Sequence, residues 1–247
     1  MKKLNLATAV LASVFAMGAN AYQAEVGGTV QYIDVDGGAT GVAVDGTYYF
    51  APVQTKNGPL NEAGFLNRAS NVSANINYLD FDGGDIKGIG AGVEYFVPNT
   101  DFYLSGNLGF SDTDAGDVTT YGAEVGYLPV ANFLVAVGIA GVDADGGSND
   151  TDATLRAKYV TNFGGYDVNL EGGLLFADDT AYTLGGDVYL DKTFSVGLGY
   201  ADSGIDGDDG VFSIRAKKFF TEQVSVEGTI DLVDDANAFG VRAAYRF

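Results

Sequence analysis

The chain has 247 residues with no Cys and no His, and its 33 acidic residues against 13 basic ones give a net charge of −20. That charge argues against a nucleic-acid-binding protein, which needs a basic surface. Without His or Cys the chain cannot carry a Ser-His hydrolase site, thiol chemistry, a disulfide framework or a His-based metal site. No pair of carboxylates stands out either, so we expect no enzyme, no cofactor and no metal.

Residues 1–21 have the pattern of a secretory signal peptide. Lys2 and Lys3 precede an apolar run, and Ala19-Asn20-Ala21 is a small-residue cleavage site. Cleavage there would leave a single domain, 22–247, with a net charge of about −22 because both lysines are lost. No later segment approaches the ~18 unbroken apolar residues of a spanning helix.

The rest of the chain reads as strands in which apolar and polar residues alternate with period two. An even number of strands of about ten residues, each with one apolar face, is typical of a bacterial outer-membrane barrel. The sequence therefore predicts an all-β fold, a transmembrane up-and-down antiparallel β-barrel of 14 strands. The predicted strands cover about 22–33, 41–51, 70–79, 86–97, 102–111, 118–128, 132–142, 153–161, 166–177, 181–190, 193–201, 211–219, 223–233 and 237–247.

The last predicted strand ends the sequence on alternating apolar residues and a terminal Phe247. This ending resembles the C-terminal signal that the outer-membrane barrel insertion machinery reads. The resemblance implies that this machinery is a partner during biogenesis.

The connections between predicted strands alternate in composition. Those after odd-numbered strands hold 20 acidic residues, offset only by Lys87, whereas those after even-numbered strands are about neutral and hold all four prolines. In an up-and-down barrel every second connection lies at the same end, so one end should carry about −19. Both chain ends belong at the other end, which is periplasmic in such barrels.

The acidic end is therefore expected to be an extracellular rim that concentrates cations and repels anions, an effect that salt screens. The Asp and Gly residues there either simply make tight solvated turns or also bridge divalent ions weakly. The stretch Asp143-Ala144-Asp145 lacks the further ligands of an EF-hand, so it predicts no metal site. The rim residues singled out are Asp82, Asp85, Asp145, Asp206, Asp208 and Asp209.

The inward faces are rich in charge. Basic residues come from predicted strands 8, 12 and 14, and strands 9 and 13 beside them supply acids. These side chains either pair across strands on a polar wall or form a constriction with a transverse field, and the two interpretations are compatible. The predicted pore-lining residues are Glu124, Arg156, Lys158, Glu171, Arg215, Lys217, Glu227, Asp231 and Arg242.

One segment, 52–69, is too long for a plain hairpin turn. Gly58-Pro59 opens a possible short helix, since Pro is tolerated at the first helical position. We expect a periplasmic-side insertion that folds into the lumen and narrows the pore, or alternatively a surface turn held against the rim. The candidate gate residues are Leu60, Glu62, Phe65 and Arg68.

The stretch GPLNEAGFLNRAS (58–70) resembles the GPLAEAAFLNxAS segment of a family of small Gram-negative outer-membrane porins. The signal peptide, the mature start YQAEV and the chain length are similar too. This chain departs from the segment at Asn61, Gly64 and Arg68, and Gly64 in place of Ala weakens a helix by about 1 kcal/mol. The resemblance implies a monomeric fourteen-stranded barrel that passes water, ions and small solutes.

We therefore expect a porin in the outer membrane of a Gram-negative bacterium, for passive diffusion of water, ions and small hydrophilic solutes, with cations favoured. Fourteen strands lie between barrels filled by side chains and open sixteen-stranded channels, so the pore should be narrow. The alternatives are a fourteen-stranded transporter of hydrophobic molecules, which would carry a long N-terminal plug, or a closed structural or adhesive barrel with long, varied loops. Expected partners are outer-membrane lipid and lipopolysaccharide, small polar solutes and cations, with no nucleic acid and a monomeric state.

Overall fold

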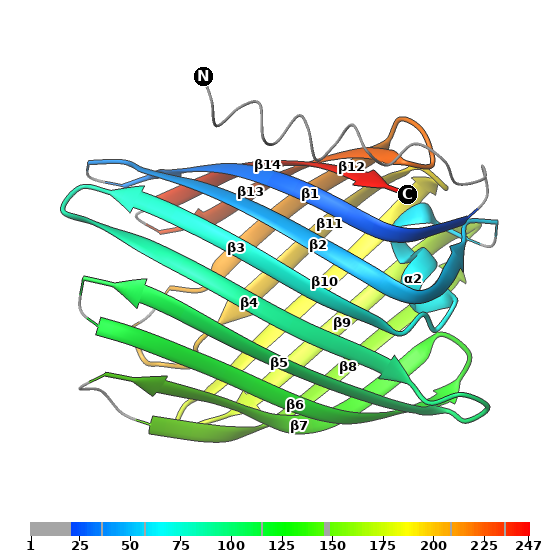
Figure 1. Cartoon of the computed structure of the whole chain (residues 1–247), viewed down its shortest axis with the longest axis horizontal. Coiled ribbons are helices and arrows are strands. Elements are labelled where there is room, and N and C mark those ends of the chain that lie inside the picture. The colour runs from blue at the N-terminus through cyan, green and yellow to red at the C-terminus, as the bar shows by residue number, and fades with distance from the viewer. Residues whose placement is uncertain are drawn as a thin grey trace.

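The computed structural model describes residues 21–35, 37–56, 58–114, 116–145, 149–207, 209–234 and 236–247. Fourteen strands form one closed barrel, in which each strand pairs antiparallel with its neighbours in sequence and β1 pairs with β14 (Figure 1). The predicted up-and-down barrel of fourteen strands is confirmed. The strands are β1 (Ala21–Asp34), β2 (Ala39–Gln54), β3 (Asn71–Phe81), β4 (Gly84–Phe96), β5 (Phe102–Thr113), β6 (Gly116–Val130), β7 (Phe133–Ala144), β8 (Asn149–Phe163), β9 (Tyr166–Phe176), β10 (Thr180–Asp191), β11 (Phe194–Asp202), β12 (Val211–Phe219), β13 (Val224–Val233) and β14 (Ala236–Arg246).

The strands run further into the acidic hairpins than the apolar alternation predicts. Asp80 lies opposite Asp85, and Asp112 lies opposite Asp117, both as regular pairs of the ladder. Hydrogen bonds between backbones continue the ladder beyond the part of each strand that faces lipid, whereas the apolar pattern stops there. Several acids expected in loops therefore stand on the ends of strands.

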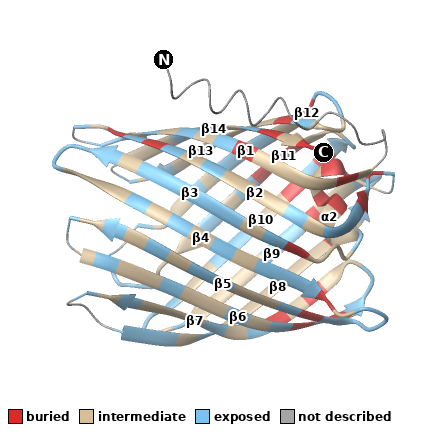
Figure 2. Cartoon of the chain, viewed as in Figure 1, coloured by how far each residue is buried: buried red, intermediate tan, exposed pale blue. Residues whose placement is uncertain are grey.

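The outward face of the barrel is apolar. Large hydrophobic side chains such as Val30, Ile76 and Leu198 are more than half exposed on alternate positions of their strands. Figure 2 shows exposed positions recurring along the strands, while buried residues gather around α2 at one end. A face of this composition is stable against acyl chains, as in barrels of the outer membrane. No helix in the described part of the chain is long and apolar enough to cross a membrane.

The two ends of the described chain meet at one end of the barrel, which we call the terminus end. There the carbonyl of Phe247 accepts hydrogen bonds from the backbone amides of Gln23 and Ala24, at 2.7 and 2.9 Å. Short turns join strands at this end, and residues with positive φ make them possible, among them Asn132 (φ 61°) and Gly165 (φ 91°). The opposite end, which carries the Asp-rich hairpins, is called the acidic end.

The irregular segment after β2 carries the helical residues of the fold. Strand β2 continues through Gln54, so this segment spans 55–70 and is shorter than the predicted 52–69. It contains a 3-10 turn, η1 (Leu60–Glu62), and one short helix, α2 (Ala63–Leu66), which lies within the outline of the barrel at the terminus end (Figure 1). We call residues 55–70 the lumenal segment.

The glycine at position 64 allows the lumenal segment to lie close to β2. A Cβ atom on Gly64 would lie 3.1 Å from the hydroxyl oxygen of Tyr49 on β2. Alanine there would require the tyrosine ring or the segment to shift by a few tenths of an ångström. Glycine is less favourable than alanine in a helix, but it leaves room for Tyr49 of β2 beside the segment.

Candidate functional site: the lumen and its constriction

The backbone of the lumenal segment is held by hydrogen bonds to backbone and side-chain groups of the barrel wall. The amide of Leu60 donates to the carbonyl of Lys192 in the β10–β11 turn at 2.8 Å, and Arg246 on β14 donates to the carbonyl of Leu60 at 2.8 Å. The ammonium of Lys192 reaches the carbonyl of Lys56, also at 2.8 Å. A segment that leaves β2 and bonds to the β10–β11 turn and to β14 must cross the barrel.

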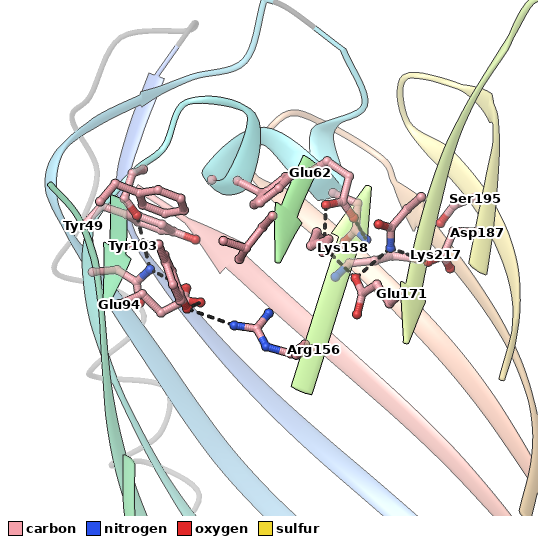
Figure 3. A pocket seen from close by; sticks show the side chains of 18 of the residues that line it. Tyr49, Glu62, Glu94, Tyr103, Arg156, Lys158, Glu171, Asp187, Ser195 and Lys217 are labelled. Carbon is pink, nitrogen blue, oxygen red and sulfur yellow. Dashed lines mark hydrogen bonds and ion pairs between the residues drawn. The ribbon is translucent and has the colours of Figure 1, made fainter. Parts of the chain in front are cut away.

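Glu62 forms the ionic contact between this segment and the wall. Its carboxylate lies 2.9 Å from the ammonium of Lys158 on β8 and accepts a 2.6 Å hydrogen bond from the hydroxyl of Tyr189 on β10. Lys158 also contacts Glu171 on β9 at 2.6 Å (Figure 3). Glu62 is only 4% exposed, so its charge depends on these two partners.

Apolar packing holds the segment on two further sides. Phe65 packs against a buried cluster of Phe96, Tyr103, Leu128 and Leu134 from strands β4 to β7. Ala63 belongs to a second cluster with Tyr22 and Val53, from β1 and β2. The terminus end of the lumen is therefore filled by side chains where the segment meets the wall.

The period-two alternation did not predict these clusters, although consecutive apolar residues in the sequence indicate them. Phe96 follows outward Tyr95, Tyr103 lies between outward Phe102 and Leu104, and Leu134 follows outward Phe133. Consecutive apolar residues near the ends of strands put apolar side chains on both faces. Such runs mark where the inner face becomes a packed core.

Two cavities lie beneath the segment. The first, about 440 Å³, touches the segment and strands around most of the circumference, and we call it the chamber. The second, about 490 Å³, lies along β2 to β8, and both are lined by Tyr49, Asn71, Glu94, Tyr103 and Arg156. The charged lining of the chamber is nearly balanced, with the acids Glu62, Glu94, Glu171, Asp187 and Glu227 and the bases Arg156, Lys158, Arg215 and Lys217.

The basic side chains of the lumen form ion pairs with acids, most of them on other strands. The pairs are Arg156–Glu124 (2.6 Å), Arg215–Asp187 (2.7 Å), Lys217–Glu227 (3.2 Å), Arg242–Glu25 (2.9 Å) with Asp45 as a second partner, and Arg246–Glu25. Arg246 also lies between the rings of Tyr22 and Phe219. The wall is thus polar and charged while each guanidinium or ammonium group remains compensated.

The structure brings most of the predicted pore-lining residues together. Glu124, Arg156, Lys158, Glu171, Arg215, Lys217 and Glu227 line the two cavities. Asp231 and Arg242 lie elsewhere on inward rows, where Asp231 accepts a 2.6 Å hydrogen bond from Ser213. Asn71, Tyr189 and Asn169 belong to the site but were not among the predicted residues, and Glu94 also lines both cavities.

The predicted gate residues divide into two groups. Leu60 and Glu62 are buried, and Phe65 packs on the buried cluster of β4 to β7. Arg68 lies apart from them, because its guanidinium pairs with Asp101 at 2.9 Å and reaches the carbonyl of Thr100 at the outer rim of the terminus end. Arg68 therefore ties the segment to the β4–β5 turn and does not line the chamber.

The predicted rim residues stand at the acidic end. Asp85 pairs with Lys87 at 2.9 Å, and Asp82, Asp145, Asp206 and Asp209 lie at or beside the hairpin turns. Asp208 lies outside the described residues. Among the residues that the structure describes, no group of three acidic side chains is arranged to hold a metal ion.

Comparisons with known proteins agree with this architecture. The family model described as "Putative general bacterial porin" matches residues 1–155. The crystal structure of the Acinetobacter baumannii outer membrane protein Omp33 is 32% identical in sequence, with 93% of this chain and 100% of that chain covered and a TM-score of 0.77. The KdgM porin, solved in complex with a disordered oligogalacturonate, is 10% identical over 90% of this chain and 99% of that chain with a TM-score of 0.50, and shows the fold alone.

No curated protein matches the chain. The family match and the Omp33 likeness both cover well over half of its length. The chain belongs to the general bacterial porin family and is a β-barrel channel of the outer membrane.

Proposed function

We propose that the protein is a passive diffusion channel for water, ions and small hydrophilic solutes, and that it favours cations. The observation that carries this proposal is the charged lining of two adjoining lumenal cavities inside an apolar outer face. A polar wall replaces part of the hydration shell of a polar solute, whereas a hydrophobic compound gains nothing from it. The chain belongs to the porin family, and its sequence contains no His or Cys that could serve in catalysis. Both observations favour a channel over an enzyme.

The acidic end is proposed to be the extracellular mouth and the terminus end the periplasmic one. This orientation follows the general arrangement of bacterial outer-membrane barrels, whose chain ends are periplasmic. The mouth then raises the local concentration of cations before they enter. The lumenal segment, bonded across the terminus end, acts as the constriction on the periplasmic side.

The protein is proposed to act as a monomer surrounded by lipid and lipopolysaccharide. Exposed apolar side chains occur on strands around the barrel, from Val30 on β1 through Leu104 on β5 to Val241 on β14. Since apolar outward positions recur on all sides, lipid can cover the entire outer face.

The cation preference should weaken as the salt concentration rises. The Debye length falls from about 10 Å at 0.1 M to about 3 Å at 1 M, so the acidic mouth is screened at high salt. With the refolded 22–247 chain in a planar bilayer, a fixed tenfold KCl gradient should give a larger cation-selective reversal potential around 0.1 M than around 1 M.

A matched variant separates the mouth from the lumen. Replacing both Asp206 and Asp209 by Asn removes two charges of the β11–β12 hairpin and should lower the preference at low salt only. A reversal potential that favours anions, or one that does not change with salt, would contradict a cation-attracting mouth.

A further inference from the structure

Glu94 stands at the junction of the two lumenal cavities. It projects from β4 and lines both the chamber and the cavity along β2 to β8, as Figure 3 shows beside Tyr49 and Tyr103. A solute that moves from one cavity to the other passes the wall that these residues share. Glu94 is therefore placed where its carboxylate can contact an ion that passes between the two cavities.

The hydrogen-bond partners of Glu94 are neutral. Its carboxylate accepts a 2.6 Å bond from the hydroxyl of Tyr103 and a 2.9 Å bond from the side-chain amide of Asn71. Among the described residues Glu94 forms no ion pair, in contrast to Glu124, Glu171, Asp187 and Glu227 around it. The two donors fix the orientation of the carboxylate but leave its charge uncompensated.

The nearest base is already engaged. Arg156 donates a 3.3 Å hydrogen bond to the hydroxyl of Tyr103, so it reaches Glu94 only through that hydroxyl. Its guanidinium makes three hydrogen bonds to Glu124, at 2.6, 3.1 and 3.1 Å. Three such charge-assisted bonds hold it away from Glu94. The remaining bases of the chamber, Lys158, Arg215 and Lys217, contact other carboxylates.

The charge balance of both cavities points to the same residue. In the chamber four bases face five acids, and in the second cavity Arg156 faces Glu94 and Glu124. Every other carboxylate that lines either cavity forms an ion pair with a basic side chain. In each cavity Glu94 is the carboxylate without a basic partner.

We propose that Glu94, oriented by Tyr103 and Asn71, is a binding site for a permeating monovalent cation, either an inorganic ion or an ammonium group. The inference rests on the proposed channel function and deepens it, because it places a determinant of cation preference inside the lumen as well as at the mouth. Carboxylate and hydroxyl oxygens together can replace part of the hydration shell of such an ion. An ion in contact with the carboxylate lies within the Debye length of about 3 Å at 1 M salt, whereas ions attracted only by the field of the acidic end are farther from its charges.

The test compares two single-charge variants in bilayer recordings at 1 M KCl, where the mouth is screened. Glu94→Gln keeps the size of the side chain and an oxygen for the Tyr103 hydroxyl. It should lower the cation-to-anion permeability ratio about threefold, because a cation in direct contact with the carboxylate lies within the Debye length of about 3 Å at 1 M and interacts with one partly screened unit charge. The control is Asp231→Asn, which removes one lumenal carboxylate that is likewise bonded only to a neutral partner, Ser213, and lies outside both cavities.

A smaller change for Asp231→Asn than for Glu94→Gln supports the site, whereas equal falls, or no fall, would overturn it. A wild-type protein that passes no ions would count against the channel itself, so a second measurement does not depend on current. Crystals soaked in Tl⁺, an anomalous scatterer of K⁺-like charge, should show a peak beside Glu94 in the wild type and none in Glu94→Gln. No peak in the wild type, or equal peaks in both proteins, would overturn the proposal whether or not the protein conducts.

Discussion

Replacing residues 56–68 by a short Gly-Ser turn is expected to raise the single-channel conductance severalfold. The replaced stretch contains Leu60, Glu62 and Phe65, through which the lumenal segment bonds to β8, β10, the β10–β11 turn and β14 and packs on β4 to β7. Removing it opens the terminus end, where those side chains now fill the lumen. The barrel itself should persist, because its ladder closes through β1 and β14 without the segment.

Arg68→Ala provides the matched control for this replacement. Arg68 belongs to the same segment but bonds to Asp101 and Thr100 at the outer rim. Its loss should leave the conductance close to that of the wild type, since exposed ion pairs contribute only about 0–1 kcal/mol. If the folded replacement variant conducts like the wild type, the segment does not constrict the pore.

Lys158→Met is expected to loosen the segment without removing it. The change leaves the carboxylate of Glu62, 4% exposed, with the Tyr189 hydroxyl as its main partner and without a counter-ion. Removing one partner of a buried ion pair typically costs about 3–5 kcal/mol. We expect a lower midpoint in thermal or denaturant unfolding, together with longer or more frequent open events in bilayer recordings.

The comparison variant is Lys217→Met. Lys217 lines the same chamber and pairs with Glu227 on β13, but none of its ion pairs involves the segment. It should alter selectivity without prolonging the open events. Adding Glu62→Gln to Lys158→Met should recover part of the lost stability, because the uncompensated charge is then gone. Indistinguishable gating in the two lysine variants would contradict the role given to the Glu62–Lys158 contact.

The barrel could be predicted from the sequence because lipid imposes one simple constraint on every strand. Outward residues such as Val30, Ile89 and Val241 must be apolar, so period-two alternation repeats across each strand. The ends of the strands could not be predicted in the same way. Pairs such as Asp80–Asp85 continue the ladder in water, where outward side chains need not be apolar.

The inward residues followed from the same alternation, and this is why Arg156, Lys158 and Arg215 could be placed in the lumen in advance. Which of these residues contact the lumenal segment depends on where the segment packs against the wall. The alternation within a single strand does not predict that position. The Glu62–Lys158 pair joins the segment to β8. Tyr22 shows a second limit, because the register shift between Tyr22 and Ala24 turns its ring to the inner face.

Single-channel recording of the refolded 22–247 chain in a planar bilayer under a salt gradient tests whether this barrel conducts ions. We expect discrete current steps with a reversal potential that favours cations. Protein shown to be folded that produces no steps would contradict this expectation, and would indicate a barrel that the lumenal segment keeps closed.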